Sequence, residues 1–259
     1  MIINILCIGD VVGSNSCEYL RKNLTEIKSK YKANIVIANG ENSADGNGIT
    51  PFSANHLFTS GVDIITGGNH TLKRKEIYEM LDTNPFMTRP INIKGADIGK
   101  GIVYYDLGYT TIAVLNLCGT TFMHDTDNAF VAAENALQEI KEKDIMVIVV
   151  DIHAEATSEK IALGHFLDGR VSAVFGTHTH VPTADLRILP GKTGYITDLG
   201  MCGPENSVLG VEKEIIINRF LGDTSERFVT SKNPTVFNGC VFTIDTSTGK
   251  TVSTMQILL

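Results

Sequence analysis

Two histidines separated by one residue, His178 and His180, follow a short apolar run at positions 171–175. The run is typical of a buried strand, so the pair is predicted to lie where a strand opens into a loop. In an extended segment, side chains two positions apart point to the same side, and both imidazoles can then face one site. Because neutral imidazole is the commonest metal ligand in proteins, the pair suggests a metal site. The alternative is that two loop histidines are close in sequence by chance. Whether other metal-capable residues accompany them decides between the two interpretations.

Metal-capable side chains recur directly after other apolar runs. The runs lie at positions 2–8, 35–38, 62–66 and 145–150, and the side chains that follow them are, in the same order, Asp10, Glu41 with Asn42, Asn69 with His70, and His153. In an α/β sheet the carboxyl ends of the strands gather at one edge, which is where binding sites form. We therefore expect these side chains to converge with the histidine pair.

This donor set is too large for a single ion. It contains two carboxylates, two amide oxygens and four imidazoles, whereas one ion takes about four to six ligands. Two ions that share a carboxylate could use the whole set. A structural zinc site would favour thiolates, and no Cys-x-x-Cys occurs. We expect two divalent or trivalent transition metals per chain, with iron preferred and manganese or zinc as alternatives.

The elements that must position these donors alternate between strands and helices. Helices are predicted over residues 17–32, 73–81, 127–142 and 158–168, and a further one begins at Pro51 behind the N-cap Thr50. Strands are predicted over 102–107 and 110–117 around Gly108, and closing strands over 215–220, 236–244 and 251–258, with 198–204 as a glycine-rich loop. No repeat, low-complexity tract or linker interrupts this order, so residues 1–259 are predicted to form one domain.

Composition and charge exclude several classes of function. The net charge of −7 gives no indication of a basic face that tracks nucleic acid, although bound metal ions would create a local positive site. The five cysteines are odd in number and lack metal-site spacing, which predicts buried thiols in a reducing compartment. No basic leader precedes the first strand and no apolar run approaches ~18 residues, so we expect a cytoplasmic protein without a membrane span.

Taken together, the motifs resemble those of the calcineurin-like metallophosphoesterases. The matching stretches are Asp10 in Gly-Asp-Val-Val-Gly, Glu41-Asn42, Gly68-Asn69-His70, His153, and Gly-Thr-His-Thr-His ending at His180. The chain departs from the usual pattern at two places. It has no histidine two residues after Asp10, and it has glutamate instead of aspartate at position 41. In both respects it resembles one subgroup, the YmdB-like phosphodiesterases. Residues 183–204 also resemble that subgroup, whereas Thr120 stands where the subgroup is expected to have arginine. The resemblance covers essentially the whole chain.

The resemblance implies a fold and a division of roles. The fold is a two-sheet α/β/β/α sandwich built as a single metallophosphoesterase domain. One metal is held by Asp10, Glu41 and His180, with Asn42 nearby. Glu41 bridges to the second metal, which is also held by Asn69, His153 and His178. His70 stands beside the cluster as a proton donor or phosphate orienter.

The activity implied is hydrolysis of 2′,3′- or 3′,5′-cyclic nucleotides or related phosphodiesters. Two metals ~3.5–4 Å apart bind a shared water and lower its pKa, and the bridging hydroxide attacks phosphorus in line. As a general acid, His70 would assist the departing ribose oxygen. The expected partners are this small substrate and further copies of the chain in a homo-oligomer; other substrate-binding residues are unassigned.

Two other functions are compatible with a histidine-rich site. Metal-dependent amidohydrolases also use a His-x-His pair, but they place it after the first strand of a barrel, whereas here the pair follows residue 175. A non-catalytic regulator could bind a nucleotide or RNA through the same metal site, because a binding pocket and a slow enzyme have the same sequence signature. Turnover measured beside binding distinguishes the regulator from the phosphodiesterase.

Overall fold

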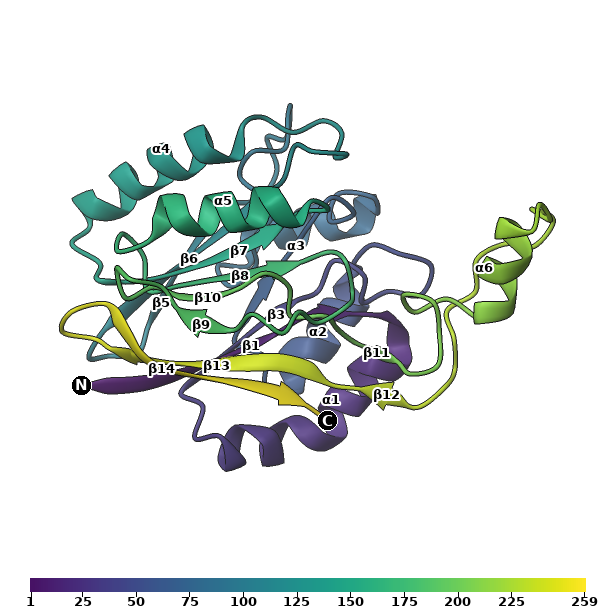
Figure 1. The fold of residues 1–259 in the computed structure, drawn as a ribbon, viewed down its shortest axis with the longest axis horizontal. Helices are drawn as coiled ribbons and strands as arrows, with labels where there is room; N and C mark the ends of the chain where they lie inside the picture. The colour runs from purple at the N-terminus through teal and green to yellow at the C-terminus, as the bar shows by residue number, and fades with distance from the viewer.

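Two β-sheets pack face to face, with helices on both outer faces, in the computed structural model, which describes residues 1–259 (Figure 1). In spatial order the first sheet contains β14 (Lys250–Leu258), β13 (Asn238–Asp245), β1 (Ile2–Ile8), β3 (Ile35–Asn39) and β4 (Ile64–Thr66). The second contains β5 (Ile102–Asp106), β6 (Thr111–Cys118), β7 (Val147–His153), β8 (Ala173–Thr177), β10 (Gly194–Ile196) and β9 (Arg187–Ile188). A small third sheet joins β12 (Thr235–Val236), β11 (Met201–Pro204) and β2 (Asp10–Val11).

The helices cover the two sheets on their outer sides. Beside the first sheet lie α1 (Gly13–Lys30), α2 (Pro51–Thr59), the 3-10 turn η1 (Lys75–Ile77) and α3 (Tyr78–Thr83), and beside the second lie α4 (Ala129–Glu142) and α5 (Thr157–Leu167). Thr50 caps α2 as predicted, because its side chain accepts a hydrogen bond from the Ser53 backbone amide. Helix α6 (Lys213–Phe220) stands apart from this body (Figure 1).

Alternating side chains along the strands build three separate cores. Leu6 of β1 belongs to the core that includes Leu24 of α1, whereas its neighbour Ile5 packs between the sheets together with Val149 of β7. The next residue of β7, Val150, belongs to the core beneath α4 and α5. This alternation follows from the two-residue period of a strand. Three cores between four layers confirm the predicted α/β/β/α sandwich.

The strands that carry the predicted donors run parallel within each sheet. In the first sheet β1, β3 and β4 are parallel, and in the second β6, β7, β8 and β10 are parallel. The carboxyl ends of the two sets meet, since the side-chain nitrogen Nδ2 of Asn39 at the end of β3 lies 3.5 Å from Nδ1 of His153 at the end of β7. The strand-end donors are thus brought to one edge of the sandwich.

Two secondary-structure predictions were wrong. Residues 215–220, predicted as a strand, lie in helix α6, which belongs to an arm formed by residues 205–234 between β11 and β12. The arm projects away from the sheets (Figure 1), so this segment has no strand to pair with, and a helix satisfies its backbone groups internally. Residues 201–204, predicted within a loop, form β11, which pairs in parallel with Asp10 and Val11. Asp10 is therefore held in a short strand.

All five cysteines are buried and unpaired, as predicted. Cys7 and Cys240 lie opposite each other in the β1–β13 ladder, within the core between the sheets. No helix in the structure combines the length and apolar character needed to cross a bilayer.

Candidate metal centre

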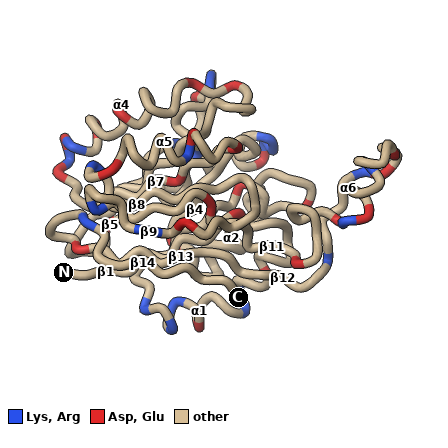
Figure 2. The backbone as a smooth tube through the Cα atoms, viewed as in Figure 1, with Lys and Arg blue, Asp and Glu red and all other residues tan.

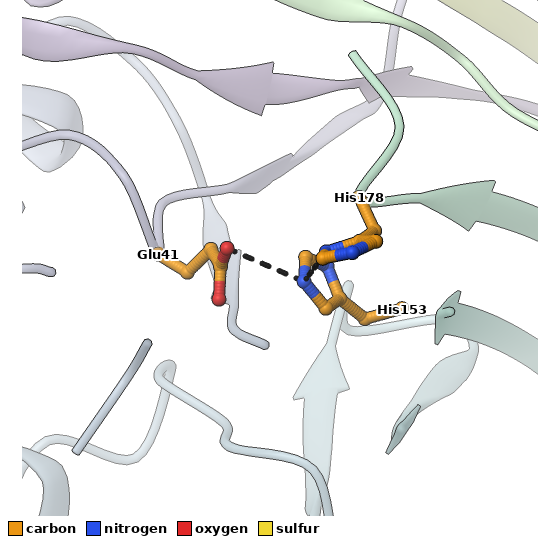
Figure 3. Close-up of side chains that lie close together, drawn as sticks. All are labelled: Glu41, His153 and His178. Carbon is orange, nitrogen blue, oxygen red and sulfur yellow. Dashed lines mark hydrogen bonds and ion pairs between the residues drawn. The ribbon is translucent and has the colours of Figure 1, made fainter. Parts of the chain in front are cut away.

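Glu41, His153 and His178 meet at the edge of the sandwich, each from a different strand end (Figure 3). One ligand atom of each lies within 4.8 Å of the others. Nε2 of His153 is 3.3 Å from Oε1 of Glu41 and 3.0 Å from Nδ1 of His178. Glu41 and His153 are buried and His178 is partly buried. A carboxylate and two imidazoles arranged in this way have the chemistry of a transition-metal site.

The remaining predicted ligands surround this trio. Oδ1 of Asn69 lies 3.0 Å from Nε2 of His153. On the other side, Nε2 of His180 is 3.8 Å from Oδ1 of Asp10 and 3.4 Å from the Asn42 amide nitrogen. That amide nitrogen donates a 2.8 Å hydrogen bond to Oε1 of Glu41. Glu41 therefore lies between two groups of donors.

His70 lies at the side of the cluster. Its backbone amide donates to Oε2 of Glu41 at 2.8 Å, and its Nδ1 is 3.2 Å from Oδ1 of Asn42. The ring is about one-third exposed. All eight residues predicted from the sequence are thus brought together.

The geometry of the histidine pair differs from the prediction. His178 and His180 have φ values of 99° and 64°, so the segment is not extended. Both values lie in the left-handed region, which is costly for residues other than glycine and is concentrated at functional sites. The two rings reach the cluster because the chain turns after β8, and not because of the alternation of a strand.

Each of the three clustered histidines has its outward ring nitrogen held by an oxygen atom. The pairs are His153 Nδ1 with Thr177 Oγ1 at 2.9 Å, His178 Nε2 with Glu155 Oε2 at 3.0 Å, and His180 Nδ1 with the carbonyl oxygen of Leu209 at 3.0 Å. Such contacts fix ring orientation and tautomer in metal sites. They direct the other nitrogen of each ring toward the cluster.

A buried carboxylate beneath the cluster sets the tautomer of His153. Asp151 lies inside β7, fully buried, and accepts hydrogen bonds from the Thr177 hydroxyl at 2.8 Å and from the Asn39 amide at 3.0 Å. Burial raises the pKa of Asp151 to about 7. Because the single hydroxyl proton of Thr177 goes to Asp151, its oxygen accepts from Nδ1–H of His153. The lone pair on Nε2 of a neutral His153 then faces the cluster.

The charge distribution of the cluster fits a cation. Asp10 is fully buried, and its Oδ1 has no hydrogen-bond partner, an arrangement that is costly for an unpaired carboxylate oxygen. Burial raises the pKa of Asp10, and the neighbouring His180 and His153 oppose that rise. Burial alone would lower the pKa of His153, but the nearby carboxylates of Glu41 and Asp10 raise it to about 9, as expected of an imidazole in a site with excess negative charge. Burial and the nearby His153 lower the pKa of His178 to about 3, which keeps its lone pair available.

A hollow of about 290 Å³ opens onto the cluster. Its lining includes Glu41, His70, Glu155, His178 and His180, and it includes no lysine or arginine. Figure 2 shows Lys and Arg interspersed with Asp and Glu along the backbone, with several basic positions along α1. An anionic group would therefore meet carboxylates and imidazoles here, and a cation held by the cluster would favour its binding.

Thr120 is not part of this hollow. Its backbone amide and its hydroxyl both donate to Oε1 of Glu159 at 2.8 Å, and the residue is exposed in the loop after β6. The side chain at this position therefore fixes the loop to Glu159 of α5 and does not line the hollow beside the cluster.

The groups that hold the clustered side chains from outside were not among the residues predicted from the sequence. Glu155 could have been found, since it follows His153 by two residues in the same run. Thr177 and Asp151 look like ordinary strand residues in the sequence. Leu209 contributes only its backbone carbonyl, for which no side-chain signal exists.

Gly68 passes so close to the cluster that no side chain fits there. A Cβ atom at this position would lie 2.3 Å from Oε2 of Glu41 and 2.4 Å from Nε2 of His153. We expect Gly68→Ala to displace both groups and to lower metal affinity by at least about 10–100-fold, the range for groups that support ligands. Elemental analysis of the variant, with its melting temperature recorded in parallel, checks this. A folded variant with the wild-type metal content would contradict it.

Comparison with known proteins gives close matches over the whole chain. The sequence model of a family described as YmdB-like protein matches residues 6–257. The chain is 46% identical over 257 residues to the 2′,3′-cyclic-nucleotide 2′-phosphodiesterase of Bacillus subtilis (strain 168), covering 99% of this chain and 97% of that protein.

Two crystal structures share its fold and about a third of its residues. A phosphatase from Mycoplasma pneumoniae superposes with a TM-score of 0.94 at 37% identity, covering 100% of this chain and 94% of that chain. A hypothetical protein from Thermus thermophilus superposes with a TM-score of 0.92 at 36% identity, covering 99% of each chain.

Proposed function

The chain belongs to the YmdB-like protein family, and from that premise we propose that it is a metal-dependent phosphoric diester hydrolase acting on 2′,3′- or 3′,5′-cyclic nucleotides or related phosphodiesters. The observation that carries the proposal is the convergence of Glu41, His153 and His178 within 4.8 Å beside a hollow without lysine or arginine. Bound metal cations would supply the positive charge that lysine and arginine do not provide in the lining of this hollow. The 46% identity to a cyclic-nucleotide phosphodiesterase supports the substrate class.

The ligand assignment follows the two groups of donors around Glu41. One metal is assigned to Asp10, Glu41 and His180, with Asn42 beside it. The second is assigned to Glu41, Asn69, His153 and His178. The donors are two carboxylates, amide oxygens and three imidazoles, which suit iron, with manganese or zinc as alternatives. The unpaired Oδ1 of Asp10 supports the first position, and the three-residue group that shares Glu41 supports the second.

The protein's own contribution is to orient the ligands and to supply a proton. Metals held by these residues would supply Lewis-acid chemistry, a more acidic water molecule and neutralisation of charge on the phosphoryl oxygens. Thr177 and Glu155 hold the rings of His153 and His178 in the orientation that ligation needs. His70 lines the hollow, where its ring can donate a proton to the departing ribose oxygen. Its backbone amide keeps Glu41 in place at the same time.

Activity assays test the proposal directly. Purified protein supplied with manganese or iron is expected to cleave bis-p-nitrophenyl phosphate and 2′,3′-cyclic AMP, and a chelator is expected to abolish both reactions. Failure of the metal-loaded protein to turn over either compound would contradict the assignment. Hydrolysis of amides or lactams without phosphodiesterase activity would instead support an amidohydrolase.

His70→Ala is expected to reduce kcat for 2′,3′-cyclic AMP by ~10²–10⁴-fold, the usual contribution of a general acid, with the metal content unchanged. The reason is that His70 reaches the hollow but is assigned to neither metal. The measurements are steady-state kinetics and elemental analysis, with His165→Ala on the exposed side of α5 as the matched control. A wild-type protein that binds nucleotide without any turnover would support a non-catalytic regulator.

We further propose that the protein is cytoplasmic, forms a homo-oligomer and consists of one domain spanning residues 1–259. Five unpaired, buried thiols support a reducing compartment. Ile217 and Leu221, which are 51% and 80% exposed in and just after α6, support contact between copies through the arm. Light scattering coupled to size-exclusion chromatography tests the assembly, and a monomer at micromolar concentration would contradict it.

A further inference from the structure

The arm contributes a single aromatic side chain to the hollow beside the metal cluster. Phe228 is 55% exposed, and it is the only Phe, Tyr or Trp among the residues that line this hollow. A second hollow of about 310 Å³ also has Phe228 and Thr230 in its wall and continues to Lys232. Phe228 thus belongs to the walls of both hollows, one of which opens onto the cluster.

The ring of Phe228 is held from outside the two hollows. The guanidinium of Arg219 lies 4.4 Å from the ring centroid, a cation–π contact, and lines neither hollow. Arg219 is in turn fixed by a 3.0 Å hydrogen bond to the carbonyl of Glu226. Next to Phe228, the Glu212 amide donates to the carbonyl of Val229 at 3.0 Å and pairs the two sides of the arm. An exposed phenylalanine is therefore kept in a defined place, although no apolar core surrounds it.

The hollow that contains the cluster is small for a whole nucleotide. Its volume of about 290 Å³ is at the lower limit of the roughly 300–1,000 Å³ typical of pockets for drug-sized ligands. If the phosphate group of a substrate binds at the cluster, the space is taken up by phosphate and ribose. The base must then lie at the rim, where Phe228 is the only flat apolar surface.

We propose that Phe228 is the stacking platform for the nucleobase, so that this site selects nucleoside phosphodiesters over phosphodiesters without a base. The proposal rests on the phosphodiesterase function proposed above, because it places the phosphate at the metal cluster. Stacking on an aromatic ring tolerates every base, since each has a π-face, and its loss on alanine substitution corresponds to ~5–150-fold in affinity. Because the base is remote from the reacting phosphorus, the loss is expected in KM, with kcat unchanged.

A tryptophan at position 228 provides a direct reporter of stacking. The chain has no tryptophan, so Phe228→Trp introduces a unique fluorophore. Adenosine 3′-monophosphate added to the zinc-loaded variant is expected to quench its emission saturably, whereas inorganic phosphate is not. The matched control is Phe220→Trp, which places the same residue on the same arm, outside both hollows. Absence of quenching at position 228, or equal quenching at both positions, would overturn the proposal.

Kinetics of the alanine variants give a second, independent test. Phe228→Ala is expected to raise KM for 2′,3′-cyclic AMP by ~5–150-fold, whereas Phe220→Ala leaves it unchanged. An unchanged KM in Phe228→Ala, with an active wild type, would refute the base platform and leave the phosphodiesterase function intact. Saturable quenching in Phe228→Trp by a protein that hydrolyses nothing would support the platform and refute the hydrolase.

Discussion

Glu41→Gln is expected to reduce kcat/KM for 2′,3′-cyclic AMP by at least about 10³-fold and to release bound metal. Glutamine preserves the shape of the side chain but removes the charge that lies 3.3 Å from Nε2 of His153. Removal of a group that only supports a metal ligand typically lowers metal affinity or activity by ~10–100-fold. Removal of a carboxylate shared by two metals is expected to lower them further. Kinetics and elemental analysis on the same preparations measure both effects.

The matched control for this variant is Glu214→Gln, which removes an exposed carboxylate on α6, a helix that stands apart from the sheets (Figure 1). It is expected to leave both the rate and the metal content unchanged. A Glu41→Gln protein that keeps the wild-type rate would show that the three converging side chains do not form the reaction centre.

Lys160→Met is expected to destabilise the protein by about 3–5 kcal/mol, the usual cost of removing one partner of a buried ion pair. Lys160 and Asp198 are both buried, with Nζ 2.6 Å from Oδ2. Asp198 also accepts hydrogen bonds from the backbone amides of Thr179 at 3.2 Å and Gly200 at 2.8 Å. Without the lysine, a buried carboxylate beside the His178–His180 turn loses its counter-charge. Chemical denaturation measures the change in the free energy of unfolding.

A second ion pair of the chain serves as the control for Lys160→Met. Lys28 and Asp63 are 3.2 Å apart but partly exposed. Lys28→Met is therefore expected to cost only about 0–1 kcal/mol, as is usual for solvent-screened pairs. An equal loss of unfolding free energy in Lys160→Met and Lys28→Met would show that the buried pair stabilises the fold no more than the partly exposed pair.

The positions of the donors at strand ends could be predicted because two local rules combine. Apolar runs such as residues 35–38 and 145–150 form buried strands, and parallel strands present their carboxyl ends at one edge. Glu41 and His153 therefore meet although more than a hundred residues separate them. Their role as ligands came from the resemblance to a known family and stays a proposal.

The error at residues 215–220 shows where local rules fail. The run Ile215-Ile216-Ile217 has high β propensity, which indicates a strand when partners are available. The arm belongs to none of the three sheets at this segment, so these residues have no strand to pair with and form a helix instead. The propensity of a short segment does not include this information.

The supporting contacts of the site could not be predicted for a related reason. The backbone carbonyl of Leu209, a residue with positive φ, contacts the ring of His180. The position of this carbonyl depends on the path of the arm relative to the sheets. Phe228 reaches the hollow from the other side of the same arm. Contacts of this kind depend on the path of the chain in space, and no motif or period in the sequence encodes them.

The metal content of the purified protein tests the central claim most directly. Inductively coupled plasma mass spectrometry on the wild type and on Glu41→Gln is predicted to find two transition-metal ions per chain in the first and a loss of metal in the second. An active wild-type protein that contains no bound metal, or equal metal in both proteins, would contradict the account.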